Sequence, residues 1–178
     1  MRLQLSEWLD WLDSITSWQF VSLLYVVRWL LLAPYIIAGR FLFTEGQLSA
    51  ASASKLSEIN PSLLFANIVI LGPLLETLVE CLVPFCILSF IHRKKGKLPT
   101  RPWLFITISA ILMVLSHPML AAIIPSFITG VFLAYCYAHF AFRGFGYAII
   151  YTTGFHAAVN VVGWTMIVFG RNTWQQLV

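Results

Sequence analysis

A membrane environment is dictated by one segment, Pro61–Ile91, which reads PSLLFANIVILGPLLETLVECLVPFCILSFI. Its 31 residues include only two charged side chains, those of Glu76 and Glu80. A helix of about 20 apolar residues crosses the hydrocarbon core of a bilayer. The segment therefore predicts a transmembrane helix that is tilted, kinked near Pro73 or Pro84, or extended beyond the hydrocarbon.

The composition of the whole chain points to the same environment. Hydrophobic residues make up 60% of the 178 residues and charged residues 10%, against roughly 45–50% and 25% in soluble domains. A soluble domain of this composition would lack the polar surface that it needs. The length fits one domain. We predict an all-α, polytopic transmembrane helical bundle of about five or six spans.

Four more apolar stretches have roughly the length of a membrane span. They are Gln19–Phe43, Trp103–Ile124, Pro125–Phe142 and Tyr147–Phe169. Together with Pro61–Ile91 they predict a single transmembrane domain over residues 19–178.

An amphipathic segment precedes the first span. Ser6–Trp18 reads SEWLDWLDSITSW, with apolar residues at helical spacing and acidic residues on another face. Tryptophan is enriched at the depth of the lipid headgroups. We therefore predict that residues 1–18 form an N-terminal interfacial amphipathic helix.

Basic residues are concentrated in one connection between apolar stretches. Five of the eleven Lys and Arg residues lie there: Arg93, Lys94, Lys95, Lys97 and Arg101. This pattern is typical of a cytoplasmic loop. Despite the net charge of +4, we expect the lipid bilayer as a partner and no nucleic acid.

The basic loop also predicts the topology. With this loop on the cytoplasmic side, the turn at Arg143 falls on the cytoplasmic side as well. The length of the chain and the lack of a targeting signal favour a prokaryotic plasma membrane.

Polar side chains inside the apolar runs are costly, so each calls for a reason. Arg28 either snorkels or marks the cytoplasmic edge of its span. Four ionisable residues stand well inside the predicted spans, Glu76, Glu80, His117 and His156, and Asn160 joins them as an amide. At about 1.5 Å per helical residue, Glu76, His117, His156 and Asn160 lie roughly 16–22 Å from the cytoplasmic edge. A carboxylate, two imidazoles and an amide thus reach nearly one depth, which predicts a site.

The four side chains suit the hydrolysis of a bond by water. Glu76 can act as a general base, and His117 can hold the other side of the attacking water. His156 and Asn160 lie four residues apart on one helix face. Both can donate hydrogen bonds to an oxygen that gains negative charge. This chemistry needs no cofactor, no metal and no side-chain nucleophile.

Three sequence motifs resemble those of the CPBP family (CAAX protease and bacteriocin-processing, or ABI) of intramembrane glutamic endopeptidases. The family pattern EExxxR, FxxxH and HxxxN is similar to GPLLETLVEC, MVLSH and FHAAVN, and SFITGVFLAY resembles its F-x-x-G helix. The resemblance implies a metal-independent peptide hydrolase that acts on membrane-associated proteins or peptides. It implies that Glu76 is the general base, that His117 binds water, and that His156 and Asn160 stabilise the oxyanion.

Three positions depart from the family pattern: Thr77 replaces the second Glu, Cys81 the Arg and Met113 the Phe. Glu and Arg four residues apart on a helix can form an ion pair. Losing both leaves no unpaired charge, whereas losing one would. We therefore interpret Thr77 and Cys81 as a joint replacement of an ion pair by neutral packing.

Other interpretations stay open. A non-proteolytic membrane binding protein, or one of bacteriocin-immunity type, could use the same scaffold, and the altered first motif favours it. A zinc enzyme could use one Glu and two His, but no HExxH is present. Each site residue taken alone also fits an interhelical hydrogen bond, and for Glu80 we expect such a stabilising role. The substrate and the oligomeric state stay open.

Overall fold

The computed structural model describes residues 15–42, 60–92, 102–117 and 122–175. Within these ranges the chain is helical apart from short turns and contains no strand, which confirms the predicted all-α class. The interfacial helix predicted at residues 1–18 lies outside the described residues except for its last four, and Ser17 already begins the first described helix.

The described helices, in chain order, are α2 (Ser17–Leu42), α5 (Pro61–Phe65), η1 (Ala66–Leu71), α6 (Gly72–Glu76), η2 (Thr77–Leu82), α7 (Val83–His92), α8 (Pro102–Ser116), α9 (Ile123–Ala141) and α10 (Phe145–Gln175). The predicted span Trp103–Ile124 is too long, because α8 ends at Ser116. Pro118 disfavours the helical conformation of the residue before it, which accounts for this end.

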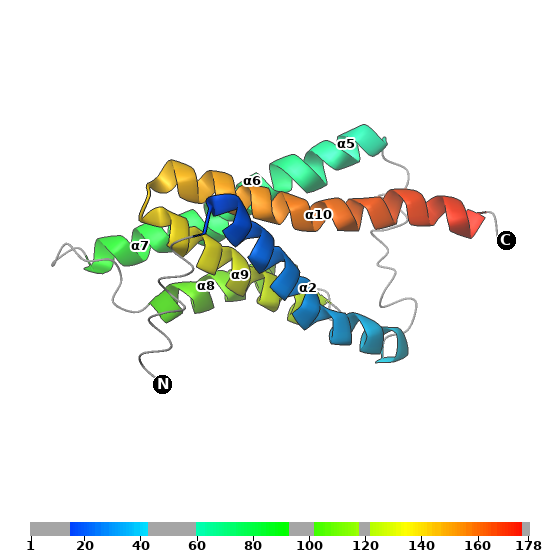
Figure 1. Cartoon of the computed structure of the whole chain (residues 1–178), viewed down its shortest axis with the longest axis horizontal. Helices are drawn as coiled ribbons and strands as arrows, with labels where there is room; N and C mark the ends of the chain where they lie inside the picture. The colour runs from blue at the N-terminus through cyan, green and yellow to red at the C-terminus, as the bar shows by residue number, and fades with distance from the viewer. Residues whose placement is uncertain (1–14, 43–59, 93–101, 118–121, 176–178) are drawn as a thin grey trace.

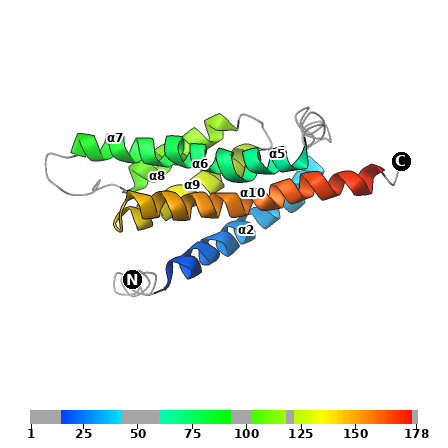
Figure 2. The same cartoon turned by 90° about the horizontal axis from the view of Figure 1, so that it is seen from above.

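Helix α9 lies at the centre of the bundle and packs against α8, α10 and α2. The rod formed by α5, η1, α6, η2 and α7 runs alongside α10, and α2 crosses the bundle obliquely (Figures 1 and 2). A tight turn joins α9 to α10. It contains Gly144, whose φ of 124° is accessible to glycine and strained for other residues.

Two π-helical turns, η1 and η2, interrupt the rod, and each ends shortly before a proline. The N–H of Gly72 bonds to Asn67 O, and the N–H of Val83 bonds to Leu78 O, in both cases five residues back. Pro73 has no N–H, and its ring crowds the carbonyl four residues earlier; Pro84 has the same effect. The wider π turn accommodates each proline without breaking the helix.

The core is built from aromatic and small side chains between the helices. Phe20, Phe105, Tyr137, Phe140 and Phe155 are fully buried, and many of the rings meet edge to face.

Gly130 sets the spacing between α8 and α9. A Cβ atom at Gly130 would lie only 2.7 Å from Ala110 Cα. The two backbones therefore approach more closely than any larger residue would permit, as small residues allow in membrane bundles.

Large apolar side chains also cover the outside of the bundle. Leu30, Phe90 and Trp103 are 67%, 74% and 74% exposed. Among the described residues, three helices are long and apolar enough to cross a membrane: Ser17–Ala38, Pro61–Ile91 and Ile123–Ala141. Trp103–Ser116 is a shorter apolar helix. These features are compatible with an integral membrane protein.

Candidate functional site

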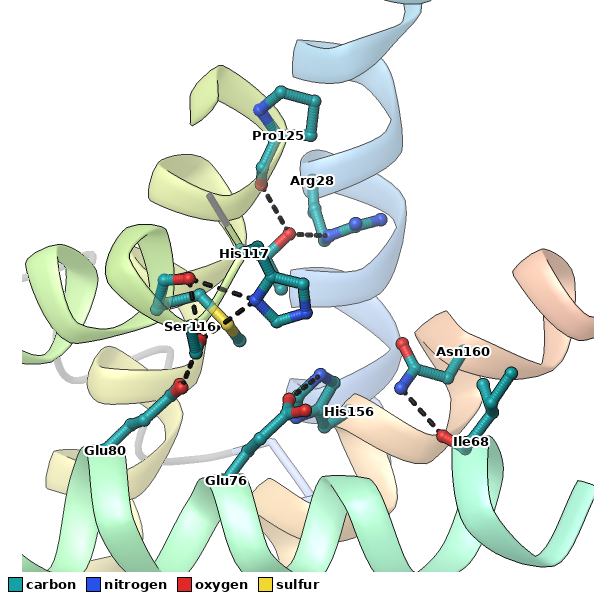
Figure 3. A network of polar contacts seen from close by, with 11 residues as sticks. Arg28, Ile68, Glu76, Glu80, Ser116, His117, Pro125, His156 and Asn160 are labelled. Atoms are coloured by element: carbon teal, nitrogen blue, oxygen red, sulfur yellow. Dashed lines mark hydrogen bonds and ion pairs between the residues drawn. The ribbon is translucent and has the colours of Figure 1, made fainter. Parts of the chain in front are cut away.

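The four residues predicted to form the site come from three parts of the bundle. Glu76 ends α6, His117 follows directly after α8, and His156 and Asn160 lie one turn apart on α10. Figure 3 shows Glu76 and His156 facing each other, with the His117 ring and the Asn160 amide directed toward the same space. The structure therefore brings all four side chains into one region.

Glu76 and His156 form the closest pair in this region. His156 Nε2 lies 3.2 Å from Glu76 Oε2, an ion-pair distance. The His156 side chain is 3% exposed and the Glu76 side chain 27%. His156 Nδ1 has no hydrogen-bond partner among the described residues. A buried imidazole thus contacts a carboxylate that stays partly exposed.

Asn160 has a structural contact that the sequence did not predict. Its Nδ2 donates a hydrogen bond to Ile68 O, at 2.9 Å. In the π turn the Ile68 carbonyl would bond to the N–H of residue 73, which is a proline and has none. Asn160 supplies the missing donor with one amide hydrogen. Its second hydrogen stays available at the cavity that Asn160 helps to line.

His117 is held by the backbone of α8. Its Nδ1 lies 3.0 Å from Met113 O. A carbonyl oxygen only accepts, so Nδ1 carries a proton in this contact, and in the neutral ring Nε2 is then a hydrogen-bond acceptor. This is the tautomer that can accept a hydrogen bond from a water molecule.

Glu80 is linked to His117 through Ser116. Ser116 Oγ donates to Glu80 Oε1 at 2.7 Å and lies 3.0 Å from His117 Nδ1. Glu80 is 4% exposed. The stabilising role expected for Glu80 agrees with this contact between η2 and α8, whereas Ser116 was missed. The sequence feature that could have identified Ser116 is its position directly before His117.

A cavity of about 140 Å³ opens beside the pair. Its polar lining consists of Arg28, His117, Ser126, Thr129, His156 and Asn160. The remaining lining residues are Met113, Pro125 and Val159. The cavity thus offers hydrogen-bond donors and a cation next to the Glu76–His156 pair.

Arg28 is the functional candidate whose place the sequence did not predict. It does not snorkel along the outside of the bundle: it is 6% exposed and lines the cavity. Its Nε donates to Thr129 Oγ1 at 3.0 Å, and Nη1 has no partner among the described residues. The available signal was a cation in an apolar span with no acidic residue one turn away.

Thr77 and Cys81 lie in the core of the bundle. Both are 1% exposed on η2. A lone charge at either position would be buried without a partner, which is consistent with neutral packing at both.

A metal site is not formed by the described residues, since no three of their His, Cys, Asp or Glu side chains are grouped closely enough to hold an ion. No family model, curated protein or solved structure matches the chain.

Proposed function

We propose that the chain is an intramembrane endopeptidase of the CPBP type, which hydrolyses a peptide bond in a membrane-associated protein or peptide. The observation that carries this proposal is the Glu76–His156 contact of 3.2 Å, beside a polar cavity within an apolar bundle. A carboxylate and an imidazole in such surroundings are costly, and costly groups of this kind mark functional sites in membrane proteins.

Water is the nucleophile in the proposed reaction. The Glu76 carboxylate takes a proton from water while the water oxygen bonds to the carbonyl carbon of the substrate. The electron pair of the C=O double bond moves onto the carbonyl oxygen. When the carbonyl re-forms, the C–N bond breaks, and the departing nitrogen takes the proton from Glu76.

The other three residues hold the reactants in this scheme. His117 Nε2 accepts a hydrogen bond from the attacking water, since Nδ1 is engaged with Met113 O. Asn160 offers its second amide hydrogen to the oxyanion. His156 offers Nε2–H once Glu76 has taken up a proton, because the carboxyl then holds that donor less strongly.

The proposed enzyme is a multi-pass protein of a prokaryotic plasma membrane with about five or six spans. In this arrangement α8 and α10 cross the bilayer together with the three helices of sufficient hydropathy. The 15 residues of α8 extend for roughly 22 Å, which requires local thinning of the bilayer or flanking residues at the interface.

A non-proteolytic binding or immunity-type protein is the alternative. Asn160 favours it, because its bond to Ile68 O gives this residue a structural use that needs no catalysis. Loss of the charged pair at Thr77 and Cys81 favours it as well.

The proposal is tested by comparing peptide termini in the membrane proteome. Cells express, at matched levels, the wild type, Glu76→Gln, His117→Ala or Cys86→Ser. Cys86 is an exposed free thiol, so its variant serves as the control. We expect new termini with the wild type and Cys86→Ser only. Identical termini in all four strains, with any phenotype unchanged, would leave the binding function as the better account.

A further inference from the structure

Arg28 is a buried cation without a carboxylate partner. The described residues include two carboxylates, and both are engaged elsewhere: Glu76 contacts His156, and Glu80 accepts from Ser116. Burying a guanidinium inside an apolar bundle is costly, and a buried charge ordinarily has a counter-ion. The cavity that Arg28 lines has no carboxylate among its described lining residues.

The guanidinium is hydrogen-bonded through Nε and keeps a buried donor at Nη1 that is unsatisfied among the described residues. Thr129 Oγ1 accepts from Arg28 Nε at 3.0 Å and donates to Pro125 O at 2.7 Å. The Arg28 guanidinium also lies 4.9 Å from the centre of the Trp29 ring. These contacts hold the group in place, while Nη1 has no partner among the described residues. Figure 3 shows Arg28 in the same polar region as His117 and Asn160, and the three residues line one cavity.

We propose that Arg28 makes the cavity a binding site for an oxygen anion of the substrate. The anion is either a carboxylate of the bound peptide or the oxyanion that develops on the scissile carbonyl. Both place negatively charged oxygen on carbon, which the guanidinium donors match. This inference rests on the proposed hydrolytic function.

The charge of the site favours a monoanion. Arg28 is the cation of the described cavity lining, and its fork supplies the donors for one carboxylate. A phosphate dianion would bring a second negative charge that these lining residues leave uncompensated. The remaining neutral donors, Ser126 and Asn160, suit an oxygen atom without adding charge.

A binding experiment tests the site without requiring cleavage. The purified full chain in detergent is melted in sodium acetate and in sodium chloride at equal ionic strength. We expect acetate to raise Tm by about 2 °C relative to chloride, and Arg28→Met to abolish this difference. Arg143→Met is the matched control, because Arg143 is exposed and bonds to Ser17 Oγ instead.

Arg28→Met should fold, since Thr129 still donates to Pro125 O and an apolar side chain replaces an uncompensated cation. We expect its Tm in chloride to equal or exceed that of the wild type. An acetate response that is absent from the wild type, or that survives in Arg28→Met, would overturn the proposal.

Kinetics on a cleaved peptide then identify the anion. A rise of at least about tenfold in KM for Arg28→Met, with kcat retained, assigns the site to a substrate carboxylate. An equal fall in kcat and kcat/KM assigns it to the oxyanion. Unchanged kcat and KM would reject both assignments of the anion.

Failure of the endopeptidase proposal gives a different result. Glu76→Gln is expected to abolish cleavage and to keep the acetate response. If the wild type cleaves nothing but binds acetate through Arg28, the hydrolytic function fails and the anion site stands.

Discussion

At the scale of single residues, the polar groups around the site include two kinds. Ser116, Thr129 and one hydrogen of Asn160 satisfy groups of neighbouring helices. Glu76 and His156 instead contact each other beside the cavity. The distinction separates residues that position the site from the pair proposed to carry out hydrolysis.

The bond from Asn160 to Ile68 O leads to a prediction about stability. Asn160→Leu should leave the Ile68 carbonyl unsatisfied and destabilise the protein by about 1–2 kcal/mol. Pro73→Ala gives residue 73 an N–H that can bond to Ile68 O. In that background, the cost of Asn160→Leu should fall by about 1 kcal/mol. Thermal unfolding of the four variants in detergent measures this coupling. An equal cost in both backgrounds would contradict the assignment.

Thr77 and Cys81 lead to a second prediction. Cys81→Arg alone introduces an unpaired charge at a position that is 1% exposed. We expect the combined variant Thr77→Glu/Cys81→Arg to have a higher Tm and a higher expression level than Cys81→Arg, because the two charges can pair. Equal melting and equal expression of the two variants would reject the idea of a replaced ion pair.

At the scale of helices, prolines and glycines set the geometry. Pro73 and Pro84 each follow a π-helical turn, and Glu76 lies between the two turns. The sequence predicts a kink near one of these prolines as one possibility, but hydropathy does not distinguish a kink from a π turn. The contact of Asn160 with Ile68 was therefore beyond prediction, because it depends on which carbonyl the π turn leaves free.

The close contact between α8 and α9 predicts the effect of a single methyl group. Gly130→Ala should push the helices apart and destabilise the protein by about 1–3 kcal/mol. Gly163→Ala is the matched control: its Cβ would meet nothing within 4 Å, and alanine favours a helix by about 1 kcal/mol. We expect a lower Tm for the first variant and an unchanged or higher Tm for the second. A similar Tm for both variants would contradict the close approach of α8 and α9 at Gly130.

At the scale of the whole molecule, two quantities predicted the fold and the site: the amino-acid composition and the depth of the polar residues within the predicted spans. The apolar composition led to the all-α class, and the shared depth of Glu76, His117 and His156 predicted that these residues meet. Depth does not specify the direction in which a side chain points around its helix. For that reason Arg28 was assigned to an interface, although it faces the cavity.

The number of spans can be tested at the turn between α9 and α10. If α8 crosses the bilayer, the turn at Phe142 lies on the same side as the basic loop; if α8 does not cross, it lies on the opposite side. We expect single cysteines at Phe142, which is 71% exposed, and at Lys97 to react with an impermeant maleimide from the same side. Cys81, Cys86 and Cys136 are first replaced by alanine or serine. Labelling from opposite sides would contradict the five-span arrangement.

The most direct test of the central claim follows oxygen from water into product. Membranes from cells that lack the protein are incubated with the purified wild type or with Glu76→Gln in water enriched in oxygen-18. With the wild type we predict new carboxyl termini that carry the heavy isotope, in equal amount with and without a metal chelator. With Glu76→Gln we predict none. The same labelled termini from both proteins, or from neither, would contradict hydrolysis by water activated at Glu76.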